Sequence, residues 1–388
     1  MTTSDRSRPA PAAPILSPRA LNRATLARQL LLTRTAMPAK DAVRHLVGLQ
    51  AQNTRPPYLA LAARLDGFDP QELSGLMESR EVARIVTMRS TLHTLTADDC
   101  LALRPLVQPV IDRELRIFLK RSPGVDIAEL APLARELVEE RPRSLKELRE
   151  GLLKRWPDND PQALATLARC ALPLLQTTPR GLWGRSGQVT LTTSRAWFGR
   201  PEPEYSPAQT DALLDATVLR YLGAFGPASV RDMQSWCGLT RLRPAFERLR
   251  PRLLAFRDVQ GTELFDLPDA PRPDEDTPAP VRLLPEFDNL LLSHADRSRV
   301  VPPEHASRTW YVNTSYSTVL VDGLLAGIWR AQEPKKDGRA TLTVELFADA
   351  GRARRTEIAE EAVRTLELLS PGADHDVRFG EFYGTKAG

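Results

Sequence analysis

At 388 residues the chain is longer than one hydrophobic core usually serves, so its length predicts two or three subdomains. Its net charge of +4 and pI near 9.1 make it mildly basic, and only 7 of its 53 basic residues are lysine. An arginine excess suits a nucleic-acid surface, although a GC-rich genome would produce the same excess, and the lack of a membrane-length apolar run or an apolar signal core in the sequence predicts a cytoplasmic protein.

The N-terminal part of the sequence predicts a leader and then a first folded unit. Residues 1–17 are rich in Pro, Ser and Ala without periodicity, which predicts a disordered leader. Helical periodicity follows from residue 18 and at residues 39–49, 58–65 and 70–79. Two β-branched stretches come next, at residues 84–87 and 91–95. Helices followed by a strand pair are typical of a helix-turn-helix with a wing, so we expect a first winged helix over residues 18–97.

The same order of patterns returns twice along the chain. A second winged helix is expected over residues 98–200, from helical patterns at 101–119, 128–139, 144–156 and 161–174 and a hairpin pattern at 182–191. A third is expected over residues 201–280, from helical patterns at 206–222, 229–236 and 242–250 and an alternating stretch at 253–267. Proline-rich linkers lie at residues 201–207 and 268–280.

Residues 281–388 change in character. Strand patterns at residues 281–284, 319–329 and 340–347 and one amphipathic helix at 356–368 predict a small β-rich, barrel-like subdomain. The fold class expected for the whole chain is therefore α+β, mainly α, with three tandem winged helices before this subdomain.

Gln50 and Gln52 flank one small apolar residue, Ala51, near the expected end of the second helix. Residues two apart on a helix point to nearly opposite sides, so both amides can reach one ligand only where the helix ends or distorts. A carboxamide is too weak a base for proton abstraction, but it both accepts and donates hydrogen bonds, so two of them can hold and orient a water. Alternatively, both glutamines are surface residues or cap backbone groups, the more common use of Gln.

Three segments in the same order carry a family resemblance: residues 45–53 (HLVGLQAQN), 86–95 (VTMRSTLHTL) and 283–301. Together they resemble the AlkZ/YcaQ family of winged-helix DNA glycosylases. Its members carry a Gln-apolar-Gln or Gln-apolar-Asp motif, so the resemblance implies that Gln50 and Gln52 are catalytic. Glutamine at both positions is similar to the branch found with antibiotic producers. The resemblance thus implies excision of bulky N7-alkylated purines, unhooking of interstrand crosslinks, and self-resistance to a genotoxin.

Candidate DNA contacts come from two groups of residues. Arg89, Thr91 and His93 lie in the segment that resembles the family, and they could contact phosphates beside the lesion. An equally favoured alternative is that Arg89 pairs with a local carboxylate and His93 is a buried strand histidine. Basic residues at expected turns and at a helix start are further candidates, although each could simply be solvated: Arg180, Arg185, Arg241, Arg243, Lys335, Lys336 and Arg339.

No metal or cofactor is expected. Cys100, Cys170 and Cys237 stand far apart, and the five histidines form no metal-spaced cluster. Asp288 and Asn289 form a polar cluster between apolar flanks but lack His or Cys at ligand spacing. We expect them to bridge subdomains through buried hydrogen bonds.

The expected activity is monofunctional. A lyase step needs an amine that forms a Schiff base, and Lys40 is the only lysine before residue 120 and stands near a helix start. Damaged double-stranded DNA is the expected partner, and the lack of a heptad or dimerisation helix favours a monomer. The alternative is a winged-helix transcription regulator without chemistry.

Overall fold

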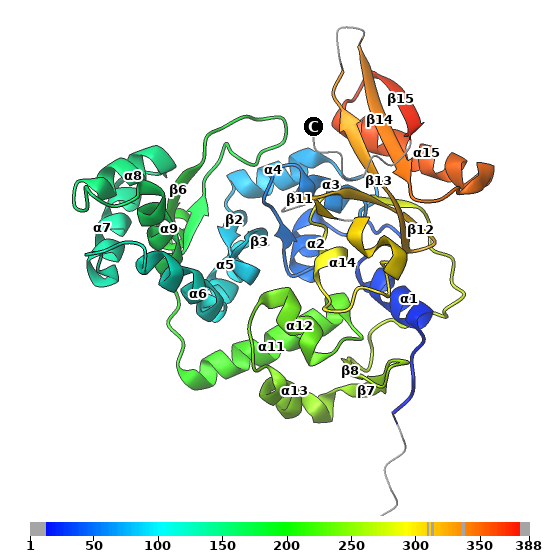
Figure 1. Cartoon of the computed structure of the whole chain (residues 1–388), viewed down its shortest axis with the longest axis horizontal. Helices are drawn as coiled ribbons and strands as arrows, with labels where there is room; N and C mark the ends of the chain where they lie inside the picture. Colours follow the sequence, from blue (N-terminus) through cyan, green and yellow to red (C-terminus); the bar gives the residue numbers. More distant parts are fainter. Residues whose placement is uncertain (1–12, 309, 312–313, 335–337, 381–388) are drawn as a thin grey trace, which may run out of the picture.

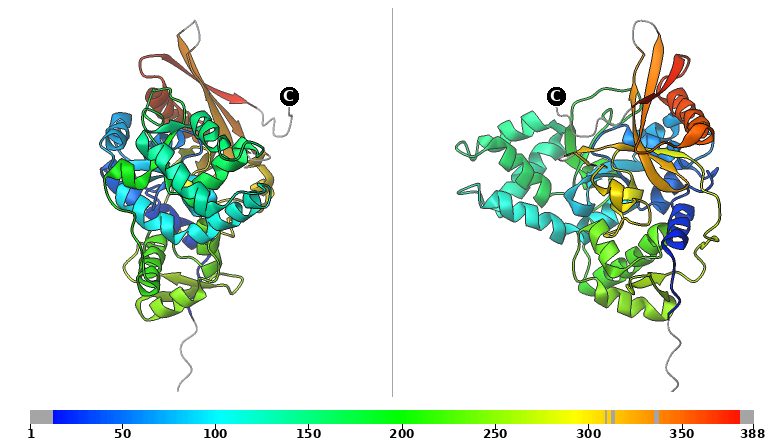
Figure 2. Two further views of the ribbon diagram at one scale, coloured as in Figure 1. Left: turned by 90° about the vertical axis from the view of Figure 1, so that its left-hand side faces the viewer. Right: turned by 45° about the vertical axis from the view of Figure 1, so that its right-hand side comes forward.

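A computed structural model describes residues 13–308, 310–311, 314–334 and 338–380. A six-stranded sheet lies in the middle of the molecule, with helices around it (Figure 1). Residues 207–266 form a lobe at one end. A smaller sheet with a long helix, built mainly from residues 317–334 and 338–380, lies at the opposite end, as the further views of Figure 2 also show. The combination of helices and separate sheets confirms the α+β class.

The described chain begins with a short extended segment before α1 (Pro18–Arg28). Leu16 N–H donates to the Arg257 carbonyl at 2.8 Å, and Arg257 N–H donates to the Pro14 carbonyl at 2.9 Å. The Ser17 side chain then caps α1 by accepting from Ala20 N–H at 3.0 Å. The prediction of disorder is therefore wrong for residues 14–17, of which 14–16 pair with Arg257 and Ser17 caps α1, and residues 1–12 lie outside the described residues.

The first set of elements follows the order helix, strand, two helices, strand pair: α2 (Ala39–His45), β1 (Leu49–Gln50), α3 (Pro56–Ala62), α4 (Pro70–Glu78), β2 (Val82–Val86), a 3-10 turn η1 (Met88–Ser90) and β3 (Leu92–Thr96). Both β1 and β2 pair antiparallel with β3. The second helix ends at His45 rather than at residue 49, because Val47 (φ 53°) and Gly48 (φ 90°) leave the helical region. A Cβ at position 48 would overlap the Leu95 side chain, so the turn into β1 requires glycine.

Two connecting helices, α5 (Ala97–Leu106) and α6 (Gln108–Leu119), lead to a second set in the same order: α7 (Ile127–Glu140), β4 (Arg143–Ser144), α8 (Leu145–Leu153), α9 (Pro161–Ala171), β5 (Leu174–Gln176) and β6 (Thr190–Thr193), followed by α10 (Ser194–Phe198). Because β2 pairs with β5, both sets share one sheet of order β1-β3-β2-β5-β6-β4. The hairpin expected at residues 182–191 is instead mostly a long loop. This β5–β6 loop packs on α3 and α4, where Tyr58 Oη donates to the Gly181 carbonyl and Trp183 N–H donates to Ser74 Oγ.

A third set comprises α11 (Pro207–Phe225), α12 (Val230–Cys237), α13 (Arg243–Leu249), a 3-10 turn η2 (Arg250–Arg252), β7 (Leu254–Arg257) and β8 (Glu263–Asp266). Ala228 forms a single antiparallel bridge with Phe265, at the place in the order where the other sets have a strand. One hydrophobic core contains Ile85 of β2 together with Phe225 and Trp236 of this set. The third set therefore packs beneath the central sheet.

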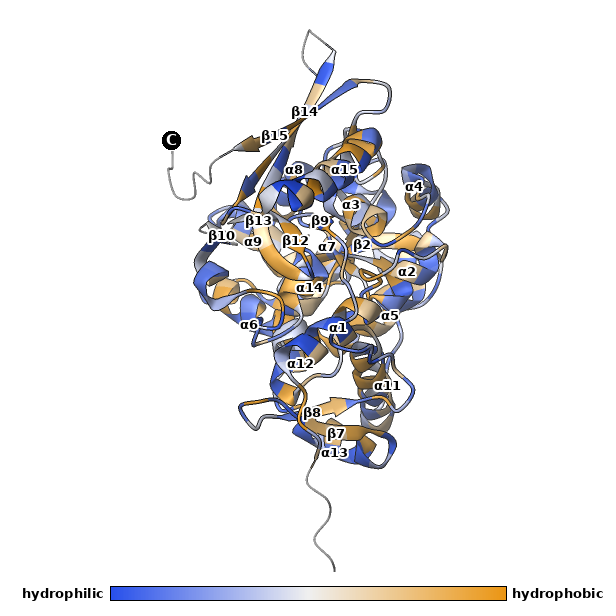
Figure 3. Cartoon of the chain, turned by 90° about the vertical axis from the view of Figure 1, so that its right-hand side faces the viewer, coloured by the Kyte–Doolittle hydropathy of each residue, from blue (hydrophilic) through white to orange (hydrophobic). Residues whose placement is uncertain are grey.

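The C-terminal part contains β9 (Arg282–Leu284), α14 (Asn289–Leu292), η3 (Pro303–Arg308), β10 (Trp310–Tyr311), β11 (Thr314–Ser315), β12 (Ser317–Val321), β13 (Leu324–Gln332), β14 (Arg339–Leu346), α15 (Gly351–Leu369) and β15 (Asp374–Gly380). Five of these strands form a sheet of order β15-β14-β13-β12-β9. Within the described residues β9 and β15 are its edges, so it is an open sheet rather than the expected barrel. Hydrophobic residues concentrate on inner strands such as β12 (Figure 3), and α15 covers the sheet through Ile358, Ala362 and Leu366.

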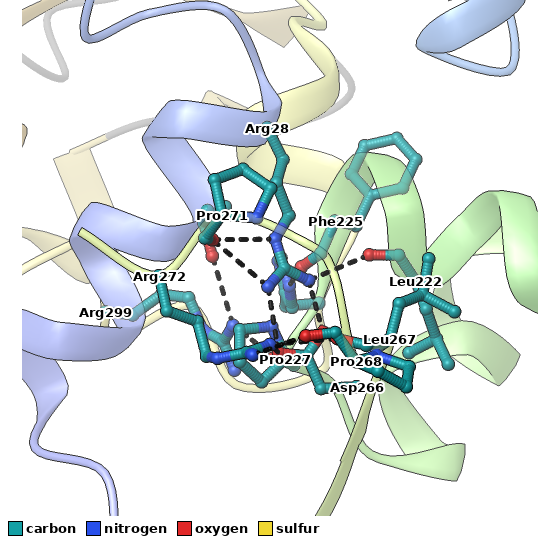
Figure 4. A network of polar contacts seen from close by, with 12 residues as sticks. Arg28, Leu222, Phe225, Pro227, Asp266, Leu267, Pro268, Pro271, Arg272 and Arg299 are labelled. Atoms are coloured by element: carbon teal, nitrogen blue, oxygen red, sulfur yellow. Dashed lines mark hydrogen bonds and ion pairs between the residues drawn. The ribbon is translucent and has the colours of Figure 1, made fainter. Parts of the chain in front are cut away.

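Buried ion pairs join segments that are far apart in sequence. Arg28 of α1 meets Asp266 of β8 through two contacts of 2.5 and 2.9 Å, and neither side chain is exposed (Figure 4). Arg64, just after α3, meets Asp288 through contacts of 2.8 and 2.7 Å in an equally buried setting. Since an unpaired buried charge costs much free energy, these contacts favour one way for α1 and the C-terminal part to dock on the central sheet and its helices.

Candidate active site

Gln50 ends the short strand β1, and Gln52 lies in the bend that follows it rather than at a helix end. Gln50 stands opposite His93 of β3. Ala51 N–H donates to the Leu92 carbonyl at 2.7 Å, so the chain continues beside β3 beyond the end of β1. The prediction of a helix-terminal site is therefore wrong, because helix α2 has already ended at His45. Both carboxamides instead bond to the segment formed by η1 and the start of β3, Gln50 to Arg89 and Gln52 to Leu92.

Hydrogen bonds determine how both carboxamides are turned. Gln50 Oε1 accepts from Nη2 of Arg89 at 2.6 Å, and Gln52 Oε1 accepts from Leu92 N–H at 3.1 Å. Because arginine and backbone N–H groups only donate, the atom that faces each of them is the amide oxygen. Neither Gln NH2 group has a hydrogen-bond partner among the described residues. Gln50 is 6% exposed and Gln52 is exposed, so the pair stands at the edge of the interior.

Arg89 supports Gln50 from the turn between β2 and β3. Its backbone is left-handed, with φ 55° and ψ 20°. Its guanidinium donates both to Gln50 and to the Trp236 carbonyl of α12. Burial lowers the pKa of Arg89 to about 10, yet the side chain stays protonated near neutral pH. The sequence placed Arg89 against a phosphate or a local carboxylate, whereas the structure turns it inward onto a glutamine and a backbone carbonyl.

His93 lies inside the sheet and Thr91 beside it. His93 is 2% exposed and its Nδ1 lies 3.0 Å from the Thr91 carbonyl. The Thr91 hydroxyl donates to the Met88 carbonyl at 3.0 Å. The burial of its ring disagrees with the interpretation of His93 as a phosphate contact. It agrees with the alternative, a buried strand histidine. Burial, and then the charge of Arg89, lowers the pKa of His93 to about 3.

The low pKa of His93 predicts a pH-dependent stability. In the unfolded chain the imidazole has a pKa of about 6.5, so as the pH falls the unfolded state takes up the proton first. The stability that comes from keeping His93 neutral is fully present above about pH 6.5 and is lost progressively down to about pH 3. At pH 5 the loss in the free energy of unfolding amounts to about 2 kcal/mol. We expect His93→Gln to reduce the drop in unfolding free energy between pH 7.5 and pH 5 by about this amount. Equal drops in both proteins, measured by denaturant unfolding, would contradict the prediction.

The segment after β9 holds the site from the side of the C-terminal sheet. Glu286 accepts from Asn53 Nδ2 at 2.5 Å, one residue beyond Gln52. Asn289 donates to the Gly48 carbonyl at 2.7 Å, directly before β1. Asp288 caps α14 and pairs with Arg64. The expectation that Asp288 and Asn289 bridge subdomains through buried hydrogen bonds is confirmed, and Asn53 contacts this segment rather than the glutamines.

Sequence reasoning missed Arg84 of β2, which is 2% exposed and donates to the Ala51 carbonyl at 2.7 Å. Nothing in a β-branched stretch marks an arginine as facing inward. Its contact with Ala51, 33 residues away in sequence, depends on the sheet, in which β1 and β2 lie on either side of β3.

The candidate DNA contacts of the β5–β6 loop differ from each other. Arg180 donates to the Gly187 carbonyl at 2.9 Å within the loop. Arg185 is exposed and lines a cavity of about 280 Å³ together with Trp183, Thr54 and Arg55. Thr54 and Arg55 follow Gln52 closely in sequence. Arg185 is therefore the member of this pair that is free to meet a polyanion.

The remaining basic candidates are scattered. Arg241 is exposed, with a left-handed backbone, at the turn before α13. Arg243 is half exposed but bonded to Glu247 and Glu263, which offset its charge. Arg339 begins β14. Lys335 and Lys336 lie outside the described residues.

No helix of the described residues is sufficiently long and apolar to pass through a membrane. Nor do three or more His, Cys, Asp or Glu side chains gather there in a way that would hold a metal ion. The three cysteines are buried and unpaired with one another.

Comparisons with known proteins agree with one another. The family model described as DNA glycosylase AlkZ-like matches residues 43–368. An interstrand DNA cross-link repair glycosylase from Streptomyces sahachiroi is 27% identical over 359 residues, which cover 86% of this chain and 92% of that protein. The solved structure of the DNA glycosylase AlkZ from Streptomyces sahachiroi superposes with a TM-score of 0.74 at 23% identity, covering 94% of this chain and 100% of that one.

Proposed function

The chain belongs to the AlkZ-like DNA glycosylase family, and from that premise we propose that it hydrolyses the N-glycosidic bond of N7-alkylated purines by positioning a water with Gln50 and Gln52. The proposed substrates include bulky adducts and interstrand crosslinks in double-stranded DNA, because the Streptomyces relative is named for crosslink repair. DNA repair, and self-resistance to a genotoxin, would be the biological use.

The proposed chemistry needs little acid catalysis. Alkylation at N7 gives the purine a positive charge, which makes the base a good leaving group. Its departure builds oxocarbenium character on the sugar, as in glycoside hydrolysis generally. The protein then has to hold a water against the sugar carbon on the face opposite the departing base.

The geometry that supports this proposal most directly is the orientation of the two carboxamides. Arg89 and the Leu92 N–H group each occupy one lone pair of a Gln oxygen. Each oxygen keeps a second lone pair, and each NH2 group keeps two donors. A water between them can therefore accept from one amide and donate to the other. Since both amides are already fixed by the protein, little reorganisation is needed when the water attacks.

The state of Lys40, the lysine nearest in sequence to Gln50 and Gln52, supports a monofunctional mechanism. Lys40 Nζ bonds to Glu81 at 2.7 Å, and this hydrogen bond raises the pKa of Lys40. A raised pKa keeps the amine protonated, whereas Schiff-base formation needs it neutral. We therefore propose that strand cleavage does not accompany base release.

We interpret the three sets of elements as winged helices, with the domain limits 18–97, 98–200 and 201–280 and a β-rich part from 281. The pairing of β1 with β3, the pairing of β4 with β6 and the bridge of Ala228 with Phe265 support this interpretation, because in each set the first strand position meets the last strand. Exposed arginines such as Arg185 and Arg241 would contact the DNA backbone, and the protein would act as a monomer.

The test of the proposed function is release of free base from alkylated duplex DNA. Duplex treated with a methylating agent or a nitrogen mustard is incubated with the protein, and free purine is quantified together with strand breaks before and after heating in alkali. We expect free N7-alkylpurine and breaks only after heating. Tight, sequence-specific binding to undamaged DNA without any base release would support a transcription regulator instead.

A further inference from the structure

Arg84 contacts the site from the side opposite to the Gln50 side chain. Its partners in register are Thr94 of β3 and Gln176 of β5, whereas Gln50 is in register with His93 and, through it, with Ile85. Side chains of neighbouring positions along a strand point to opposite faces. Arg84 thus approaches the segment from the face that carries α3 and α4, and its Nη2 donates to the Ala51 carbonyl at 2.7 Å.

The surroundings of Arg84 do not neutralise its charge. Nε and Nη1 are buried and have no hydrogen-bond partner among the described protein atoms. Arg28 and Arg64 are equally buried, but each faces a carboxylate through two contacts. At Arg84 burial lowers the pKa to about 10, and the charge of Arg180 acts in the same direction. Among the described residues, the one acceptor of the Arg84 guanidinium is therefore a neutral backbone carbonyl.

The β5–β6 loop of the second set encloses this arginine. Gly181 has φ 99°, and a Cβ there would come within 2.8 Å of Arg84 Cδ. The loop is held down by Tyr58 Oη, which donates to the Gly181 carbonyl at 2.6 Å. Glycine is required at this position by both the backbone conformation and the close approach.

A buried, unpaired cation is a poor choice for stability, because an apolar side chain of similar size needs no desolvation and leaves no donor unsatisfied. Polar groups that break this rule concentrate at functional sites. On the premise of the proposed function, we infer that Arg84 is a positioning residue, which holds the Ala51 carbonyl so that Gln50 and Gln52 keep their mutual orientation. The second set of elements takes part in the site through the loop that encloses Arg84.

Replacement by an apolar side chain separates this role from a structural one. In Arg84→Met we expect a melting temperature equal to or above that of the native protein, because a desolvated charge is removed. We expect kcat for release of N7-methylguanine from duplex DNA to fall by about 10- to 100-fold, the range for a displaced nucleophile. KM should stay unchanged, because Arg84 does not reach the surface. Arg84→Lys, which restores one donor, should recover part of kcat.

The matched control is Ile85→Val, the next residue on the same strand, whose side chain lies in the core on the other face. We expect a slightly lower melting temperature and an unchanged kcat. A lower melting temperature in Arg84→Met, with unchanged activity per folded molecule, would assign Arg84 a structural role and overturn the inference.

Amide hydrogen exchange makes the inference independent of the assumed activity. The peptide that covers residues 49–53 should exchange at least about 10-fold faster in Arg84→Met, while the peptides of β3 and β5 keep their native rates. Unchanged exchange at residues 49–53 would overturn the inference even if the enzyme is active. Absence of base release by the native protein, together with faster exchange in the variant, would instead reject the proposed function and leave Arg84 as the residue that fixes this segment.

Discussion

Replacing Gln52 with alanine is expected to lower kcat for release of an N7-alkylpurine by about 10- to 1000-fold, the range for lost positioning or for one lost preorganised dipole. Gln52 is exposed, and within the described part of the chain its side chain makes one hydrogen bond, in which Oε1 accepts from Leu92 N–H. The variant should therefore remain folded, and its defect should reflect a misplaced water. Single-turnover base release with excess enzyme measures the chemical step directly.

The control for this prediction is Asn53→Ala, the adjacent residue. Asn53 is also exposed, but its side chain donates to Glu286 rather than to either glutamine. We expect native kcat in this variant. Full activity in Gln52→Ala, or an equal loss in both variants, would reject the assignment of the pair.

Gln50→Ala should be just as inactive but is harder to interpret. Removing this side chain leaves Nη2 of Arg89 without its acceptor in a buried position, which costs about 1 to 3 kcal/mol of stability. Activity therefore has to be expressed per folded molecule. Gln52→Ala gives the clearer result of the two, because only its exposed side chain is lost.

Local signals predicted the fold well where the responsible residues are adjacent in sequence. The helix expected over residues 70–79 is found at Pro70–Glu78, because Asp69 caps its first turn and proline is tolerated there. The helix expected to reach residue 49 is shorter, because the break occurs at Val47, a residue type that rarely adopts positive φ. Gly48 does indicate a helix end, since glycine is typical just past a helix C-terminus, but the positive φ begins one residue earlier, at Val47.

The candidate site shows a different limit of sequence reasoning. The family-like segments make Gln50 and Gln52 the candidate catalytic pair, and the polar cluster at Asp288 was correctly expected to bridge subdomains. The inward orientation of the Arg89 side chain could not be predicted, because its second acceptor is the Trp236 carbonyl, 147 residues away in sequence. An arginine side chain can reach outward to a phosphate or inward to a carbonyl with equal ease, and only tertiary packing decides between the two.

Replacing Asp266 with alanine should destabilise the protein by about 3 to 5 kcal/mol, the cost of breaking a buried ion pair. Asp266 accepts from Arg28 and also from Arg272 at 2.7 Å, and its own side chain is fully buried (Figure 4). The substitution leaves the Arg28 guanidinium buried beside backbone carbonyls alone. Denaturant unfolding at pH 7.5 measures the loss. Glu150→Ala is the control, because Glu150 and Lys146 form an exposed pair 3.9 Å apart, and it should change stability little.

The double variant Arg28→Met with Asp266→Leu shows what this ion pair contributes. If the penalty in Asp266→Ala comes from an uncompensated charge, removing both charges together should recover most of the lost stability, because apolar replacements of buried ion pairs are often neutral or stabilising. A double variant that is as unstable as Asp266→Ala would show that the packing of these side chains, and not their charge, is what matters. Recovery would mean that the pair mainly specifies how α1 docks against β8. In that case the double variant should keep its stability while α1, which begins next to the segment that pairs with Arg257, exchanges its amides faster.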